Sequence, residues 1–289
     1  MIQALPSPSP LKRLAQLVLL VVLPLSVGVL VAWAGVPRPQ VGVIRFQDII
    51  WYQSSEYMNE LLDYARSDDN IRAVVLQLDS PGGAVIYTEE LFFHLLELRK
   101  TKPLIVSIDS MAASGGYYMA VAGDYILAKP ASIVGNIGVI SSLPSVDEQR
   151  FTDESYVSTG PFKFSGGSRG DFVRQIELLK MGFLTTVFSQ RGDRLKTDRE
   201  TLSSGEVFLG LQAKQLGLID ELGSTSEAIA RAAAMARIAH YEVVDVSELV
   251  YPPEEEEAAD DQEAVGGLPV DHLARGLYYL YIEPAQRRP

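Results

Sequence analysis

The stretch IRAVVLQLDSPGG, residues 71–83, joins an almost uninterrupted apolar run to a turn made of proline and glycine. An apolar run without alternation is typical of a strand that is covered on both faces, as in a parallel sheet. Pro81 restricts the backbone of the turn, whereas Gly82 and Gly83 permit conformations and close approaches that bulkier residues do not allow. The stretch therefore predicts a buried strand that ends in a tight turn.

Similar strand-like runs alternate with amphipathic stretches on both sides of this segment. Short β-branched runs predict strands, and apolar residues that recur with a helical period predict helices. The predicted strands are 41–46, 71–78, 103–108, 124–128 and 136–140, and the predicted helices are 54–66, 86–99, a segment that opens near Ser114, 171–200 and 224–238. This alternation predicts an α/β fold with a mostly parallel β-sheet and flanking helices.

Shifts in composition divide the chain into five predicted segments. Two prolines make 36–40 a stiff linker, and the acidic stretch that follows residue 250 is too polar to form a core. The segments are a cytoplasmic stub with a transmembrane helix at 1–35, the linker at 36–40, a folded domain at 41–250, an acidic disordered linker at 251–267 and an apolar, aromatic C-terminal segment at 268–289. The last segment is too short for a second span and is predicted to form a docking or interfacial helix.

Residues 14–34 are uncharged and almost wholly apolar. A helix of this length reaches roughly 30 Å, which matches the hydrocarbon core of a bilayer. Lys12 and Arg13 precede the run, and positive residues tend to stay in the cytoplasm, so we expect a single-pass anchor in the cell membrane with the folded domain on the extracytoplasmic side. The alternative is a cleaved signal peptide, because Ala32-Trp33-Ala34 fits a small-x-small cleavage pattern. The length of the apolar run favours the anchor.

Composition argues against several classes of function. The net charge of −12 provides no basic surface for a phosphate backbone, so nucleic acid is a poor candidate partner. The chain has no cysteine, which excludes disulfides, thiolate metal sites and a cysteine nucleophile. The three histidines, His94, His240 and His272, do not show the spacing of a zinc site. We therefore expect no metal or other cofactor.

The segment SMAASGGYYMAVAGD, residues 110–124, follows a predicted strand and opens a predicted helix. A serine at such a turn is exposed, and the N-terminus of the helix offers free N–H groups to a developing oxyanion. Ser114 is therefore the candidate nucleophile, and Gly115 and Gly83 are the candidate oxyanion donors. Taken alone, each glycine pair is better explained as a structural turn, and only their joint occurrence favours a functional role. Asp79 and Asp109 flank these motifs, and we interpret them as turn or capping residues because no motif places a histidine nearby.

Four motifs together resemble the signal peptide peptidase A family of serine peptidases, whose relatives include the Clp protease and crotonase folds. They are DSPGG at 79–83, SMAASGGYYMA at 110–120, VGNIGVI at 134–140 and SGEVFLGLQAKQLGLIDELGS at 204–224. In the family, the glycines and alanines of the last motif pack a pair of helices. The resemblance spans residues 41–246.

The resemblance implies a serine and lysine dyad, with the lysine in a G-x-x-K pattern downstream of the serine. Gly160 and Lys163 match this pattern, 49 residues after Ser114. A lysine acts as a base only when burial or a nearby positive charge lowers its pKa, and Phe162 and Phe164 are expected to supply part of an apolar environment. On residue chemistry alone, a lysine in a loop is normally a solvated charge.

The resemblance also implies partners and substrates. A single-domain chain resembles the family members that assemble as homo-oligomeric rings, in which the dyad forms between neighbouring subunits. The implied substrates are apolar, extended peptides in or near the membrane, such as remnant signal peptides. Three alternatives stay open: a quality-control protease for membrane proteins that works with a stomatin-like partner, an inactive peptide-binding scaffold, and an acyl-CoA enzyme of the crotonase type.

Overall fold

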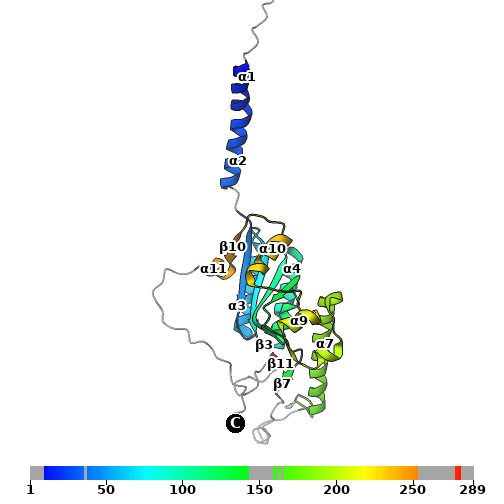
Figure 1. The fold of residues 1–289 in the computed structure, drawn as a ribbon. Helices are drawn as coiled ribbons and strands as arrows, with labels where there is room; N and C mark the ends of the chain where they lie inside the picture. Colours follow the sequence, from blue (N-terminus) through cyan, green and yellow to red (C-terminus); the bar gives the residue numbers. More distant parts are fainter. Residues whose placement is uncertain are drawn as a thin grey trace, which may run out of the picture. The chain divides into compact units, whose positions relative to one another are not determined.

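The computed structural model describes residues 10–35, 38–142, 159–160, 162–163, 166–252 and 277–280. The chain divides into two compact units, Met1–Pro39 and Gln40–Pro289. Figure 1 shows the course of the chain with the labels used below.

The first unit contains three helical segments that follow one another without a break. They are α1 (Pro10–Leu17), the π-helical turn η1 (Val18–Val22) and α2 (Leu23–Gly35). Large apolar side chains along these segments are exposed, for example Leu19 and Leu20. Taken one by one, the helices in the described part of the chain lack the combination of length and apolar character that a membrane crossing requires.

The described residues of the second unit form an eight-stranded sheet in which five strand pairs along the order β10-β1-β2-β4-β5-β9 are all parallel. Strand β6 extends the sheet by pairing with β4 in parallel, and β8 pairs with β6 antiparallel. The strands are β1 (Gln40–Phe46), β2 (Ile71–Ser80), β4 (Leu104–Ala113), β5 (Tyr125–Ala128), β6 (Ile133–Gly135), β8 (Val207–Leu209), β9 (Glu221–Leu222) and β10 (Glu242–Asp245). The expectation of a mostly parallel sheet in an α/β fold is confirmed.

Helices cover both faces of this sheet. Alternate side chains of its central strands accordingly enter two different apolar clusters, one on each face. Val43, Ala73 and Val75 pack with Ala228 and Ala232 of α10 on one face. The other face is covered by α3, α4, α5 and α7 and holds the larger cluster. The helices of this unit are α3 (Tyr52–Ser67), α4 (Val85–Thr101), α5 (Gly115–Ala120), α7 (Arg169–Arg191), η2 (Gly192–Arg194), α8 (Arg199–Ser203), α9 (Gly210–Leu216), α10 (Thr225–Met235) and α11 (Val246–Val250).

A second, three-stranded sheet has the order β3-β11-β7, and both of its pairings are antiparallel. Strand β3 is Gly82–Ala84, β7 is Ile140–Ser141 and β11 is Leu277–Leu280. The C-terminal segment was expected to form a helix, and this expectation is wrong for the residues that are described. Tyrosine is common in strands, and pairing with β3 and β7 provides hydrogen-bond partners for the extended backbone. The acidic stretch is described only at its first two residues, 251–252.

Three further expectations are wrong in detail. The predicted strand 136–140 is interrupted, because Asn136 has φ +54° and ends β6. The predicted helix 171–200 breaks after α7, because Gly192 takes φ +51° and η2 follows. The motif at 204–224 forms strand β8, helix α9 and strand β9 rather than a pair of helices.

Candidate active site

Ser114 occupies the turn between the end of β4 and the start of α5. Its backbone has φ 53° and ψ −120°, a conformation that non-glycine residues rarely adopt. The Ser114 N–H donates to the carbonyl oxygen of Gly135 at 2.8 Å, and its own carbonyl accepts the first helical bond from the Tyr118 N–H at 3.0 Å. Rare backbone conformations of this kind cluster at active sites, where the surrounding structure holds them in place. The predicted strand-to-helix turn is therefore present at Ser114.

The exposure of Ser114 differs from the sequence-based expectation. The residue is 1% exposed, whereas a nucleophile at this turn was expected to be accessible. All residues of α5 are also buried, and α5 contacts β2, β3, β4 and β11. The turn is therefore packed beneath neighbouring elements.

The DSPGG turn lies directly beside this serine turn. Ser80 is fully buried, and its Oγ donates to the Asp48 carbonyl at 2.7 Å and accepts from the Gly82 N–H at 3.2 Å. Gly82 has φ +102°, which only glycine adopts at low cost. A Cβ on Gly116 would lie 2.5 Å from the Ser80 carbonyl oxygen, so the first turn of α5 packs against this backbone. The two glycine-containing motifs that the sequence singled out are thus in contact.

Gly83 is required by a close approach of backbone to backbone. A Cβ at this position would lie 2.1 Å from the carbonyl oxygen of Ile50. The Ala84 N–H donates to that oxygen at 2.9 Å, and the N–H groups of consecutive residues in a strand point to opposite sides. The N–H of Gly83 therefore faces away from Ile50, toward the side on which β11 lies. A donor with this orientation is suited to a ligand that lies along β3.

Gly115 is the first residue of α5. The first N–H groups of a helix have no carbonyl partner within the helix, and here the first intrahelical bond begins at Tyr118. The role of Gly115 as an oxyanion donor stays a prediction.

The VGNIGVI motif holds the serine turn from the other side. Gly135 has φ +105° and accepts the hydrogen bond from Ser114. Asn136 is anchored to the segment before β8: its N–H donates to the Glu206 carbonyl at 2.8 Å and its Nδ2 to the Gly205 carbonyl at 2.7 Å. Sequence reasoning used this motif only for its resemblance and did not select Gly135 or Ser80, because a glycine and a serine in a turn carry no chemical signal of their own.

Lys163 lies in a turn whose backbone bond runs from the Lys163 N–H to the Gly160 carbonyl at 3.3 Å. Gly160 has φ +90°, and the side chains of Lys163 and Phe162 are exposed. Phe164 lies outside the described residues. Among the described residues, no contact joins Lys163 to Ser114, and the dyad stays a prediction.

The two acidic residues that flank the motifs have structural partners. Asp79 accepts hydrogen bonds from the Ser110 Oγ at 2.7 Å and from the Met111 N–H at 3.1 Å. Asp109 forms an ion pair with Lys129 and accepts a hydrogen bond from Gln77 at 3.2 Å. They cross-link neighbouring segments at the ends of β2 and β4, which corrects the expectation of simple turn or capping roles.

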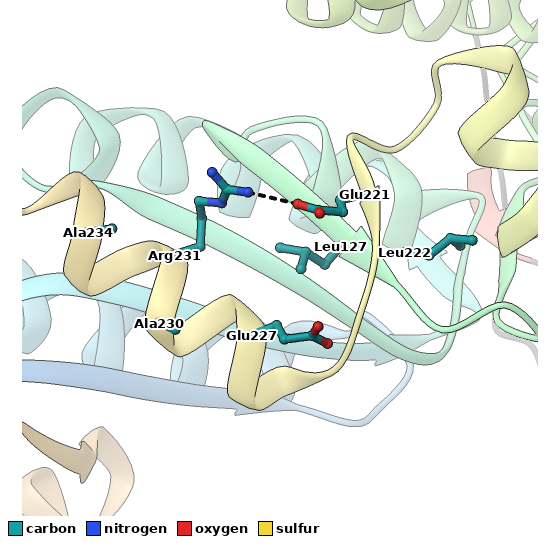
Figure 2. A pocket seen from close by; sticks show the side chains of 7 residues that line it. All are labelled: Leu127, Glu221, Leu222, Glu227, Ala230, Arg231 and Ala234. Carbon is teal, nitrogen blue, oxygen red and sulfur yellow. Dashed lines mark hydrogen bonds and ion pairs between the residues drawn. The ribbon is translucent and has the colours of Figure 1, made fainter.

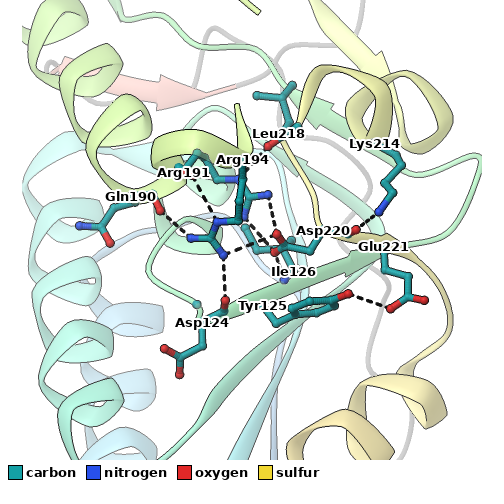
Figure 3. Close-up of polar contacts among 12 residues, drawn as sticks. Asp124, Tyr125, Ile126, Gln190, Arg191, Arg194, Lys214, Leu218, Asp220 and Glu221 are labelled. Carbon is teal, nitrogen blue, oxygen red and sulfur yellow. Dashed lines mark hydrogen bonds and ion pairs between the residues drawn. The ribbon is translucent and has the colours of Figure 1, made fainter. Parts of the chain in front are cut away.

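A buried ion pair joins α7 to the segment between α9 and β9 (Figure 3). Arg191 donates to both carboxylate oxygens of Asp220 at 2.9 Å, and Asp220 accepts from the Ile126 N–H at 2.8 Å. The adjacent Tyr117 hydroxyl donates to the Leu218 carbonyl at 2.8 Å, and burial raises the pKa of Tyr117 far above its usual range. The hydroxyl therefore stays protonated, and its hydrogen bond anchors α5, the helix that begins directly after Ser114.

A cavity of about 310 Å³ lies elsewhere, between α10 and the edge of the sheet at β5 and β9 (Figure 2). Its lining includes Leu127, Glu221, Glu227 and Arg231, and the last of these pairs with Glu221 at 2.8 Å. None of the predicted site residues lines this cavity. Among the described residues, no group of three or more potential metal ligands is found.

The family model described as Peptidase family S49 matches residues 97–239, which include the serine turn, the VGNIGVI motif and Lys163. This chain belongs to peptidase family S49. The predicted resemblance is confirmed at the level of the family, and the acyl-CoA alternative is set aside.

Relatives of this S49 chain come from all three domains of life. A protein of Methanocaldococcus jannaschii is 29% identical over 67% of this chain and 65% of the relative. Protease 4 of Salmonella typhi is 31% identical over 60% of this chain and 30% of the relative. The chloroplastic serine protease SPPA of Arabidopsis thaliana is 29% identical over 68% of this chain and 31% of the relative. The chain thus spans about a third of the two longer relatives.

One solved structure shares the fold with a TM-score of 0.52 and 15% sequence identity, over 73% of this chain and 93% of the other. It is the membrane-bound stomatin-specific protease 1510-N, in a lysine-to-alanine variant that is bound to a substrate peptide. At this identity the likeness supports the fold alone.

Proposed function

We propose that this S49 chain is a membrane-anchored serine endopeptidase that cleaves apolar, extended peptides such as remnant signal peptides. The observation that carries the proposal is the strained, buried turn at Ser114, which packs directly against the backbone that leads into β3. A nucleophile next to an extended strand is the arrangement that a peptidase needs, because the strand aligns the peptide whose carbonyl is attacked.

The proposed chemistry uses four residues. Lys163 accepts the proton of the Ser114 hydroxyl while the Ser114 Oγ attacks the peptide carbonyl, and the N–H groups of Gly83 and Gly115 stabilise the oxyanion. The C–N bond then breaks, the protonated lysine gives its proton to the leaving amine, and an acyl-enzyme remains. Water deprotonated by Lys163 hydrolyses this ester and regenerates Ser114. No metal or other cofactor takes part in the proposed reaction.

Lys163 is proposed to reach Ser114 from a neighbouring copy in a homo-oligomeric ring. In one copy, the Lys163 side chain is exposed and Ser114 is buried. Assembly would remove Lys163 from solvent, which is the condition under which a lysine becomes a base.

The membrane location is proposed from residues 14–34. These residues belong to consecutive helical segments, and large apolar side chains such as Leu20 and Leu25 are 71% and 69% exposed. Exposed apolar side chains on every side of a helix favour a lipid environment. Lys12 and Arg13 before the run favour an extracytoplasmic catalytic domain.

Two alternatives differ in substrate or in chemistry. The first is a quality-control protease that acts with a stomatin-like partner, as the name of the structural neighbour suggests. The second is a scaffold that binds peptides without cleaving them. A synthetic signal peptide and a stomatin-derived apolar peptide, offered in parallel, distinguish the first alternative, and binding without hydrolysis identifies the second.

The proposal is tested with the full chain in detergent and a fluorogenic apolar peptide. Ser114→Ala and Lys163→Ala are each expected to lower kcat/KM by at least about 1,000-fold, since the groups of such a site act as a unit. Ser67→Ala, at the end of α3, and Lys180→Ala, on α7, are matched controls that should retain activity. Activity that survives Ser114→Ala would contradict the proposal.

A mixing experiment tests the proposed origin of the lysine. If the dyad forms between copies, co-assembly of the Ser114→Ala and Lys163→Ala chains restores activity to roughly a quarter of the sites, by random pairing around a closed ring. No recovery in mixed rings would place both residues of the dyad in one copy.

A further inference from the structure

The DSPGG turn is held by a second backbone segment, the loop at 48–50 between β1 and α3. The Ile50 N–H donates to the Gly82 carbonyl at 2.8 Å, and the Ala84 N–H donates to the Ile50 carbonyl at 2.9 Å. Ile50 and Gly83 form a parallel bridge, and the Ile50 side chain is fully buried. The loop is therefore a fixed backbone partner along one side of β3.

These bonds set the direction of the Gly83 N–H. In a trans peptide unit, the carbonyl of one residue and the N–H of the next point in opposite directions. Because the Gly82 carbonyl accepts from the Ile50 N–H, the Gly83 N–H points away from Ile50. Glycine on both sides leaves this peptide unit with little steric restraint, so its orientation depends on its hydrogen bonds. The direction of the candidate oxyanion donor is thus set by the bond on the opposite side of its own peptide unit.

The Ser80 hydroxyl connects this loop to the turn. Ser80 is fully buried, and its Oγ donates to the Asp48 carbonyl at 2.7 Å and accepts from the Gly82 N–H at 3.2 Å. Both of these partners are backbone groups, one in the loop and one in the turn. The backbone of Ser80 also pairs with Ala112 of β4, two residues before Ser114. Ser80 therefore lies between the segment that carries the donor and the strand that leads to the nucleophile.

We propose that Ser80 is a positioning residue for the oxyanion hole, because its hydroxyl holds the loop at 48–50 against Gly82 and so keeps the Gly83 N–H directed away from Ile50. The inference rests on the proposed peptidase function and adds to that site a residue outside the four that carry its chemistry. Without the hydroxyl, the Gly82 N–H and the Asp48 carbonyl each lose a hydrogen-bond partner inside the protein, where an unpaired polar group is costly. The turn then samples other orientations of the peptide unit, and the donor is aligned for only part of the time.

Hydrogen exchange tests this positioning without any need for catalysis. In the full chain with Ser80→Ala, the amides of Ile50 and Ala84 should exchange at least about tenfold faster than in the parent, because the loop and the turn separate more often. Ser107→Ala is the matched control, since Ser107 is a buried serine of β4 whose Oγ bonds to the Thr225 Oγ1 at 3.1 Å. It should leave the exchange of both amides unchanged. Equal exchange in Ser80→Ala and in the control would overturn the inference, whether or not the protein is a peptidase.

Inhibition by a peptide aldehyde tests the consequence for the reaction. The aldehyde carbon bonds to the Ser114 Oγ, and the aldehyde oxygen then takes the oxyanion position, so the Ki of the aldehyde reports on the donors. Ser80→Ala should lower kcat at least about tenfold, leave KM within about twofold and raise this Ki by the factor by which kcat falls, as for an interaction made only in the transition state. A loss of folded protein alone lowers kcat without changing Ki. An unchanged Ki, with peptide hydrolysis by the parent intact, would overturn the positioning role and leave the proposed peptidase function standing.

Ser54→Ala perturbs the same loop from its other end and decides the question if Ser80→Ala fails to fold. The Ser54 Oγ donates to the Ile49 carbonyl at 2.7 Å and accepts from the Trp51 N–H at 2.9 Å, so it holds the loop at the start of α3. Its loss should lower kcat and raise the Ki of the aldehyde at least about threefold. Ser224→Ala, which removes a serine from the start of α10, is the control and should change neither value. A Ser54→Ala chain with the Ki of the parent would contradict the inference.

Discussion

Ser114 has a backbone conformation that its own chemistry does not favour. A non-glycine residue in such a conformation costs on the order of 1–3 kcal/mol, which the surrounding structure must supply. Three neighbours around the site, Gly82, Gly135 and Asn136, also have positive φ. Hydrogen bonds from the Ser114 N–H to Gly135 and from Asn136 to the segment before β8 hold these turns together. The position of the nucleophile therefore depends on residues that take no part in the proposed chemistry.

A substitution at Gly116 tests whether the position of Ser114 depends on the packing of α5 against the DSPGG turn. In Gly116→Ala the new Cβ would lie 2.5 Å from the Ser80 carbonyl, so α5 must move away from the end of β2. We expect a loss of stability of about 1–3 kcal/mol from overpacking and a fall in kcat/KM of about 100-fold from misplacement of Ser114. Urea denaturation and peptide hydrolysis measure the two effects.

Gly138→Ala is the matched control for this substitution. Apart from its two chain neighbours, no described residue has an atom within 4 Å of the position where its Cβ would be, so stability and activity should stay close to those of the parent. If Gly116→Ala behaved like Gly138→Ala, the contact between α5 and the DSPGG turn would not position Ser114.

At the residue scale, the sequence predicted Ser114, Gly83 and Gly115 from local signals, namely a serine and glycines at turns that follow apolar strands. The structure places these turns in contact, whereas the role of Lys163 rests on the resemblance to the family and stays a prediction. Ser80 and Gly135 could not be predicted, because their importance comes from partners that lie 32 residues before and 21 residues before them, respectively.

At the scale of elements, a buried ion pair attaches the C-terminal end of α7 to the segment that leads into β9. The side chains of Arg191 and Asp220 are 1% and 6% exposed, and their bidentate contact joins α7 to the segment between α9 and β9. Arg191 Nε also donates to the Gly217 carbonyl at 2.8 Å. Since Tyr117 of α5 bonds to Leu218 in the same segment, the lock also reaches the helix that begins after Ser114.

Asp220→Asn is expected to lower the free energy of unfolding by about 3–5 kcal/mol, because it leaves the buried guanidinium of Arg191 without its counter-charge. The midpoint of urea denaturation measures the change. Glu97→Gln removes one partner of the exposed ion pair with Lys100 and should not shift the midpoint measurably. Similar midpoints for Asp220→Asn and the control would show that the buried pair does not support the fold.

The elements themselves were largely predictable. The strands at 41–46, 71–78, 103–108 and 124–128 and the helices at 54–66 and 86–99 lie close to their observed bounds, because their apolar patterns are strong and local. The C-terminal strand was not predictable, since a Tyr-rich segment becomes a strand only when distant strands such as β3 and β7 offer it backbone partners. The antiparallel addition of β8 to β6 depends in the same way on a distant partner.

At the scale of the whole molecule, the chain combines an apolar helical unit with an α/β unit. We expect the first unit to keep the protein in the membrane. Leu20→Arg together with Val21→Arg places two charges in the middle of the apolar run, at a cost of about 2.5–3.5 kcal/mol each in a bilayer. The parent should remain with the membranes after alkaline carbonate extraction, whereas the double variant should appear in the supernatant.

Gln3→Arg adds a charge outside the apolar run and is the control for this extraction. It should stay with the membranes like the parent. Release of the parent itself by carbonate would contradict the proposed anchor. It would not bear on the proposed active site at Ser114.

The short lengths of β3 and β7, three and two residues, have a consequence for association between molecules. Without β11, both strands would present open backbone edges, and such edges recruit strands from other chains. A preparation that has lost residues 277–280 to proteolysis should therefore aggregate at concentrations that the intact protein tolerates.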